Sequence, residues 1–306
     1  MLTMGAHDPA RAAELAELAL VEAGGDAAAR PVALEAAAIL DMNLGRTARA
    51  AERADAGPVA EVARILDGRA MAAFLNGRIT DAVGSFGRIA ALFEDSGELL
   101  RVVTPRSTRG HGLVFHSEPA EGLAETSAAL QLATDLGAPE GRDYALWHRS
   151  EALSALGRLD EAEADAREAL SVAQEVSHRG WTATAWRALG IALQGQYRLD
   201  EAAAAFGESA RVAGETLTLF ASWAAARCAL VAVALGRLDD AARSVDRALA
   251  VGPPLGHYEA RLAQVELATA RGSDDCTALA AAARHRARAG GHLASVPRLA
   301  ELAGRT

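Results

Sequence analysis

The sequence contains no lysine, so all 31 of its basic residues are arginines. A chain without lysine cannot form a Schiff base, use a lysine general base or build the phosphate-binding loop that needs a lysine. Its only cysteines are Cys228 and Cys276, which excludes a multi-cysteine zinc site and a disulfide framework. This sparse cysteine usage is typical of a reducing compartment, and we expect a cytoplasmic protein.

Long apolar runs are also absent, and none approaches the ~20 residues of a membrane span. The formal net charge of −9 disfavours general binding to nucleic acid or to an anionic membrane. Aromatic residues make up only 4% of the chain. Alanine, in contrast, is abundant and has the highest helix propensity. No segment alternates with a period of two, so the sequence predicts helices and no sheet.

One short phrase recurs along the chain with a spacing near 40 residues. It combines Leu-Gly-Arg with a following polar or acidic cluster and alanine, and it occurs at Leu44–Ala50, Asn76–Ala82, Leu156–Ala162 and Leu235–Ala241, with a variant at Gln196–Ala202. Each copy is typical of a helix–turn–helix corner, because a left-handed glycine ends one helix and acidic residues begin the next. The two-period gap between Gly77 and Gly157 predicts a degenerate turn at Ser117.

The repeat around Trp186, Leu189, Gly190, Leu193 and Ala202, which continues to Phe206, resembles a tetratricopeptide (TPR) repeat. The resemblance implies an all-α, right-handed superhelix (α-solenoid) of about seven helix pairs. Its forty-residue period also resembles the helical sensor regions of MalT-like and LuxR-type large regulators of actinobacteria. Those regulators carry nucleotide-binding and DNA-binding modules that we do not find in this sequence, so the resemblance implies at most the sensor part.

We expect a single domain over residues 1–306. It would contain a lone N-terminal helix over 8–23, repeats over 31–289 and a closing helix within 290–306. The first of these segments is similar to the second helix of a pair whose first helix is absent. This start suggests a piece, or a reduced descendant, of something longer; the alternative is an N-terminal cap.

Helical periodicity places one set of positions on the face that lines the concave groove of a TPR superhelix. On this basis we predict a ligand- or peptide-binding surface that contains Arg64, Asp67, Met71, Phe74, Ser107, His111, Phe115, Tyr144, Trp147, Glu151, Arg187 and Trp223. Aromatic walls with a few polar groups suit a small-molecule or peptide groove. The alternative is that these rings fill the inside of a tight superhelix or pack between repeats.

Arg69, Arg109 and Arg149 form a ladder with forty-residue steps, at positions where TPR repeats usually carry an apolar residue. We expect inter-repeat salt bridges, for example to Asp67, Asp143 or Glu151, because a guanidinium is rarely buried unpaired. The alternative is that the ladder binds an anionic ligand or an acidic peptide.

The third unit, residues 101–118, is irregular. Pro105 lies near its expected helix start, Gly110 matches a small packing position, and Gly112 should weaken the helix by ~1 kcal/mol relative to alanine. The unit is therefore a candidate recognition or hinge element, or else has drifted in an exposed repeat. If it binds a ligand, we expect Arg106, Arg109 and His111 close to it.

We find no H-E-x-x-H motif, no G-x-S-x-G elbow and no dinucleotide-binding fingerprint. We therefore predict no catalytic residue, no metal site and no cofactor. The preferred function is a non-catalytic sensor or regulatory module whose groove binds a small molecule or short peptide. A stand-alone protein-interaction scaffold is the alternative, and an enzyme using the Arg/His-rich third repeat is the least favoured. A homodimer through the solenoid ends is a further expectation.

Overall fold

The computed structural model describes residues 9–26, 29–43, 46, 49, 52–53, 63–214 and 217–304. These residues form helices and connecting turns without a strand, which confirms the predicted all-α solenoid. None of the described helices has the length and apolar character needed to cross a membrane.

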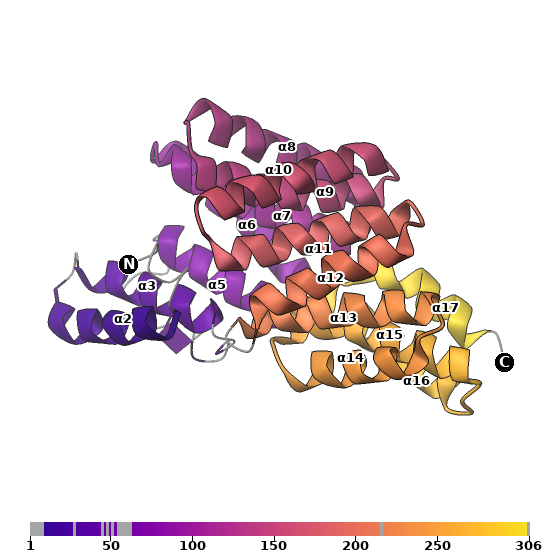
Figure 1. Ribbon diagram of the computed structural model, residues 1–306. Helices are drawn as coiled ribbons and strands as arrows, with labels where there is room; N and C mark the ends of the chain where they lie inside the picture. Colours follow the sequence, from indigo (N-terminus) through magenta and orange to yellow (C-terminus); the bar gives the residue numbers. More distant parts are fainter. Residues whose placement is uncertain are drawn as a thin grey trace.

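The helices follow one another as antiparallel neighbours (Figure 1). Those of the first half are α2 (Pro9–Ala23), α3 (Ala29–Asn43), α5 (Ala63–Leu75), α6 (Ile79–Asp95), α7 (Leu99–Phe115), α8 (Pro119–Asp135) and α9 (Pro139–Ala155). The second half contains α10 (Leu159–Glu175), α11 (Arg179–Gly195), α12 (Leu199–Ala213), α13 (Thr218–Ala234), α14 (Leu238–Ala250), η1 (Pro254–Gly256), α15 (His257–Arg271), α16 (Cys276–Gly290), η2 (Leu293–Ser295) and α17 (Val296–Ala303).

Left-handed residues set the forty-residue period. They occur every twenty residues, at Gly77, Gly97, Ser117, Gly137, Gly157, Ser177 and Tyr197. In the α9–α10 turn, Arg158 N–H donates to Leu153 O and Gly157 N–H to Ser154 O, which is the Schellman pattern. Ser117 has a φ of 66°, so the predicted degenerate turn is confirmed. The turns within a helix pair, such as α9–α10, resemble the turns that connect one pair to the next. Two 17-residue helices and their two turns therefore span forty residues.

Odd-numbered helices from α7 onward line the inside of the curve. Besides its sequence neighbours, α7 packs on α9, α9 on α11, α11 on α13, and α13 on α15. The even-numbered helices α8, α10, α12 and α14 lie on the outside. We call the first set the inner helices and the second the outer helices.

The third unit is tightly packed, contrary to the expectation of a hinge or a drifted exposed repeat. Pro105 lies well inside α7 rather than near its start. A Cβ atom added at Gly110 would lie 2.7 Å from the Gly122 carbonyl oxygen, and one at Gly112 would lie 2.6 Å from Val83 Cγ2. The two glycines therefore let α8 and α6 approach α7 closely from two sides.

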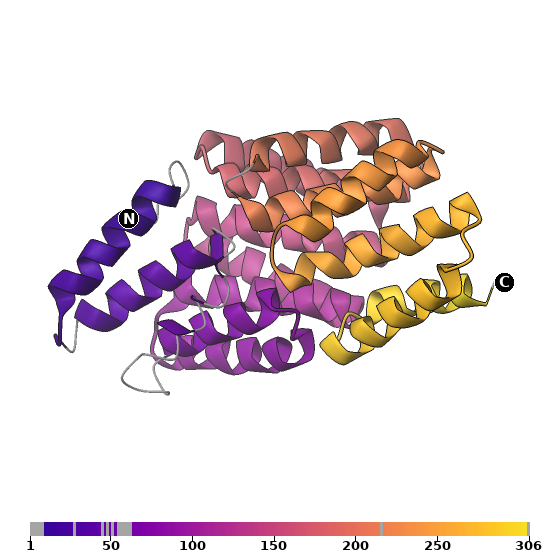
Figure 2. The same cartoon turned by 90° about the horizontal axis from the view of Figure 1, so that it is seen from below.

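The C-terminal helices return to the N-terminal half and close the curve (Figure 2). Tyr258 Oη donates a hydrogen bond of 2.8 Å to the carbonyl oxygen of Gly77, 181 residues away. The His292 ring stacks on Phe115 with centroids 4.7 Å apart. A Cβ atom at Gly291 would lie 3.4 Å from Thr80 Cβ, so the backbone of this turn contacts the start of α6. We call these contacts of Tyr258, Gly291 and His292 with Gly77, Thr80 and Phe115 the ring closure.

At the N-terminus, α2 covers the segment that the sequence predicts as a lone helix. α2 packs against α3 through Ala12, Ala16, Ala37 and Leu40. The first recurring phrase, 44–50, lies almost entirely outside the described residues. At the other end, α17 lies within the segment where a closing helix was expected.

Candidate functional site

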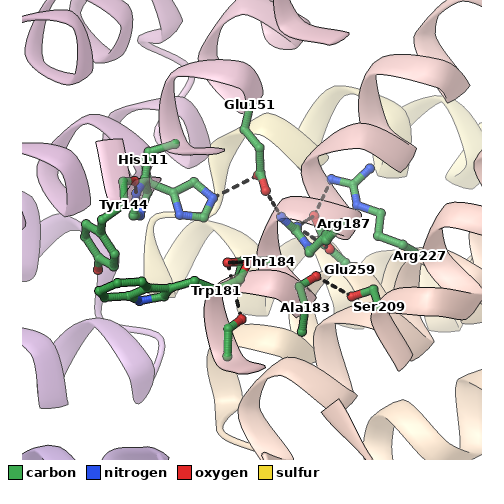
Figure 3. A network of polar contacts seen from close by, with 12 residues as sticks. His111, Tyr144, Glu151, Trp181, Ala183, Thr184, Arg187, Ser209, Arg227 and Glu259 are labelled. Carbon is green, nitrogen blue, oxygen red and sulfur yellow. Dashed lines mark hydrogen bonds and ion pairs between the residues drawn. The ribbon is translucent and has the colours of Figure 1, made fainter. Parts of the chain in front are cut away.

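The interior of the ring contains a buried network of charged side chains contributed by successive inner helices (Figure 3). Glu151 on α9 accepts hydrogen bonds from Arg187 on α11 and from His111 Nε2 on α7, the latter at 3.0 Å. Arg187 Nη2 also donates to both carboxylate oxygens of Glu259 on α15, each at 2.9 Å. Arg227 on α13 donates to the same carboxylate. Side chains from the five inner helices α7, α9, α11, α13 and α15 thus meet in one network.

The network balances two carboxylates against two guanidinium groups. Burial alone would raise the pKa of Glu259, but Arg187 and Arg227 outweigh it and lower this pKa to about 2. Burial likewise opposes ionisation of Glu151, yet Arg187 and His111 hold its pKa well below the usual range. Arg187 is only 1% exposed, so the free-energy cost of burying its charge must be offset by these two carboxylates.

Rings pack around this network and fill the centre of the curve. His111 lies within 5.6 Å of the ring centroids of Phe115, Trp147 and Trp223. Arg187 lies over the Trp223 ring, 4.9 Å from its centroid, which adds a cation–π contact. Burial lowers the pKa of His148 well below its usual value, and it lowers that of His292 to about 4. Both imidazoles are therefore neutral at neutral pH.

Several buried polar atoms of the inner helices have no hydrogen-bond partner. They are Ser107 Oγ, His111 Nδ1, both carboxyl oxygens of Asp143, Trp147 Nε1, Ser154 Oγ, Arg187 Nε, Thr218 Oγ1, Trp223 Nε1 and Arg227 Nε, and His292 Nε2 beside them at the ring closure. Within the part of the chain that the structure describes, the outer helices contribute no such atom. Buried groups of this kind are uncommon and call for an explanation.

The predicted binding residues divide into two groups. The structure brings together eight of them in the interior: Phe74, His111, Phe115, Tyr144, Trp147, Glu151, Arg187 and Trp223. Ser107 is also buried there, and Met71 packs at the side of the same core. These side chains do not line an open groove, because neighbouring inner helices and the C-terminal helices cover them. The alternative interpretation, in which the rings fill a tight superhelix, is the one that the burial supports. Asp67 on α5 is half-buried, and the side chain of Arg64 lies outside the described residues.

Arg106 and Arg109 do not point into the interior. Arg106 pairs with Glu94 on α6 at 2.6 Å, and Arg109 pairs with Glu121 and Glu125 on α8. The expectation that they lie beside His111 at a common ligand site is wrong for this arrangement, because they leave α7 on its outer side.

Two arginines of the ladder, Arg109 and Arg149, form salt bridges, but with partners other than those predicted. Arg149 forms a two-pronged pair with Asp165 on α10, at 2.6 and 2.7 Å. Like the pairs of Arg109, this bridge joins the two helices of one pair rather than adjacent repeats. Asp143 and Glu151 take no part in it.

Sequence reasoning missed Arg227, Glu259 and His292 as members of the interior cluster. Arg227 was missed because this repeat is one residue shorter: the turn residues Tyr197 and Gly236 are 39 positions apart, so periodicity places Ala226, not Arg227, at the position equivalent to Arg187. The signal for Glu259 was its groove-face position in the last unit. His292 lies outside the repeat pattern, and nothing local in the sequence indicates its stacking on Phe115.

A hollow of about 430 Å³ lies on the outside, lined by Ser177, Arg179, Thr182, Arg211 and Val212. Its arginines are engaged: Arg179 Nη2 donates to Val212 O, and Arg211 pairs with Glu208. We assign no ligand to it.

Comparison with known proteins supports the repeat assignment. Residues 142–215 match the tetratricopeptide repeat family. No curated protein sequence matches the chain.

Solved structures share the fold at low identity. A Rap protein complexed with competence and sporulation factor aligns with a TM-score of 0.67 at 13% identity, over 90% of this chain and 84% of that one. NprR in complex with its cognate peptide NprX aligns at 0.58 and 10% identity, over 96% and 83%. A tetratricopeptide repeat protein from Parabacteroides merdae aligns at 0.50 and 15% identity, over 97% and 99%. The chain is therefore a TPR-type α-solenoid, with the repeat family itself matched over residues 142–215.

Proposed function

We propose that the chain is a non-catalytic binding module for a peptide or a short segment of a protein partner. Its binding surface is the face of the inner helices α7, α9, α11 and α13 that the ring closure now covers. The observation that carries this proposal is that unpartnered buried polar atoms gather on the inner helices, whereas the described outer helices α8, α10, α12 and α14 contribute none. In an open form these atoms would hydrogen-bond to a ligand or to water.

The chemistry of these atoms favours a peptide over a small molecule. N–H donors without partners occur on three successive inner helices, from Trp147 through Arg187 to Trp223 and Arg227. A row of donors spread over several helices suits the regularly spaced carbonyl oxygens of an extended chain. The Rap structure contains competence and sporulation factor and the NprR structure contains its cognate peptide NprX, and both share this fold.

We also propose that the module is regulatory, because it resembles the sensor regions of MalT-like and LuxR-type regulators. Opening of the ring closure would then transmit the bound state to an effector. The absence of enzymatic activity is part of the same proposal. It is supported by His111 and Glu151, since both are committed to the ion-pair network and buried away from any substrate.

A reversible lock across the ring closure tests the proposed surface. Thr80→Cys combined with Gly291→Cys, in a chain whose Cys228 and Cys276 are replaced by alanine, places two Cβ atoms close to disulfide distance. Peptides are selected from a random phage-displayed library on the reduced protein, and their affinity is measured before and after oxidation. We expect oxidation to weaken binding at least about tenfold, and reduction to restore it.

The single variant Thr80→Cys, which cannot cross-link, controls for the effect of oxidation itself. A second variant acts in the opposite direction: Phe115→Ala loosens the ring closure and should strengthen peptide binding. Equal affinity in the locked and reduced forms, with no gain in the Phe115 variant, would refute the inner-face proposal. So would the failure of the reduced protein and the Phe115 variant to select any peptide.

A further inference from the structure

One edge of the solenoid exposes a group of leucines outside the interior. Leu92 lies in the last turn of α6, Leu99 and Leu100 begin α7, and Leu136 follows α8. Leu100 is 58% exposed and Leu136 is 42% exposed. We call these four residues the leucine edge.

The packing of the helix ends brings these leucines to one place. Because α7 and α8 are antiparallel, the start of α7 lies beside the end of α8. The first turn of α9 joins them, since a Cβ atom at Gly141 would lie 3.3 Å from both Val103 on α7 and Ala133 on α8. Single exposed leucines are ordinary, but several on adjoining helix ends form a patch that marks an interaction site.

Exposed carboxylates lie on the same helix ends as the leucine edge. Asp95, Asp135 and Glu140 are exposed, and among the described residues no guanidinium or imidazole pairs with any of them. Asp135 accepts only a hydrogen bond from the amide of Gln131. The neighbouring arginines are already paired: Arg101 with Glu98, Arg106 with Glu94 and Arg142 with Glu168. The edge is therefore apolar at its centre and negatively charged around it.

We infer that the leucine edge binds a basic amphipathic helix of a protein partner. The apolar stripe of such a helix would cover Leu99, Leu100 and Leu136, and its lysines or arginines would reach Asp95, Asp135 and Glu140. This inference goes beyond the proposed function, because the edge lies outside the interior and is open with the ring closed. The module would then bind a peptide inside and a basic helix at its edge.

The test uses a synthetic helix of about 18 residues, roughly 27 Å long, with leucines on one face and lysines on the other. Its fluorescently labelled form is titrated with the full chain at physiological ionic strength. We expect the double variant Leu100→Gln with Leu136→Gln to weaken binding at least about tenfold. Asp135→Asn with Glu140→Gln should weaken it and reduce its salt dependence.

Leu156→Gln is the matched control. Leu156 follows α9 as Leu136 follows α8, and it is 38% exposed, but it lies at the opposite edge, so its variant should bind like the wild type. A scrambled peptide of the same composition should bind weakly. Equal binding of the scrambled peptide, or no effect of the two leucine substitutions, would overturn the inference. A dimer in sedimentation experiments that the leucine substitutions abolish would also overturn it, since a second copy would then be the occupant.

Discussion

Arg187 Nη2 donates to both carboxylate oxygens of Glu259 at the centre of the ring, although the two residues are 72 positions apart in the sequence. The helix α13 comes between their own helices in the order of packing. A side chain of α11 can reach α15 only because the superhelix is tight enough for alternate inner helices to meet across its axis. The ion pair can therefore form only while α11 and α15 lie close together in the closed solenoid.

Removing the charge of Arg187 should strongly destabilise the fold. Arg187→Met keeps most of the side-chain volume but leaves Glu151 without its guanidinium and Glu259 with Arg227 alone. Loss of one partner from a buried pair typically costs about 3–5 kcal/mol. We expect a loss of this size in the free energy of unfolding, measured by urea denaturation.

Arg158→Met provides the control for that substitution. Arg158 pairs with Glu161 on the surface, where solvent screens the interaction, so the stability should hardly change. Similar losses for the two variants would contradict the view that the central network stabilises the closed ring.

Asp143 predicts a decline of stability with rising pH. Burial without a hydrogen-bond partner raises the pKa of its carboxyl group to about 8. Between about pH 4 and pH 8 the folded state therefore holds a proton that the unfolded state has lost. Stability falls through this interval by up to about 1.4 kcal/mol per pH unit and is constant above it.

Asp143→Asn removes this titration without changing the shape of the side chain. The variant should be more stable than the wild type at pH 8, and the difference should shrink as the pH approaches 4. Because other titrating groups are common to both proteins, the difference isolates Asp143. A difference that does not vary with pH would show that the carboxyl group is not protonated in the folded state.

For His292 we predict the opposite pH dependence: the stability of the fold should decrease as the solution becomes more acidic. Burial lowers the pKa of its imidazole to about 4, below the ordinary value of 6.5. Between about pH 4 and pH 6.5 the imidazole is therefore protonated in the unfolded state and neutral in the folded state. The free energy of unfolding consequently decreases as the pH falls from about 6.5 to about 4. Since His292 stacks on Phe115 at the ring closure, acid should loosen this contact first.

His292→Gln should show a shallower loss of stability than the wild type between pH 6.5 and pH 4. Hydrogen exchange of the amides in α16 and α17, measured at pH 5, would locate the opening. Equal acid sensitivity of the two proteins would assign the effect to other buried groups, such as His148.

The regular part of this fold could be predicted from the sequence because it depends on local interactions. Each helix from α5 to α11 ends just before a left-handed residue, so the forty-residue spacing placed even Ser117, where no glycine marks the turn. Helical periodicity also placed Tyr144, Trp147, Glu151, Arg187 and Trp223 on a common face. Both inferences need only the neighbouring residues and the 3.6-residue period.

The closure of the ring could not be predicted in the same way. It depends on the radius and pitch of the superhelix. Small differences in helix packing add up over many repeats and change both. The contact between Tyr258 and Gly77 joins residues 181 positions apart, outside any repeat pattern. For this reason periodicity could place Trp147, Glu151 and Arg187 on one face but could not show that this face is buried, and its role in binding stays a prediction.

The last prediction concerns Gly112, which the sequence alone suggests as a weak point of its helix. Replacing a helical glycine by alanine ordinarily stabilises a protein by about 0.5–1 kcal/mol. Here the added Cβ atom would lie 2.6 Å from Val83 Cγ2 and 3.4 Å from Phe74 Cε2, so α6 and α7 would have to separate. We expect Gly112→Ala to destabilise the chain by about 1–3 kcal/mol in thermal or urea unfolding. Gly207→Ala in α12 is the matched control, because its Cβ atom would meet nothing within 4 Å and the usual gain should appear. A gain at both positions would mean that α7 is a loosely packed element after all, and that the close approach of α6 does not require glycine.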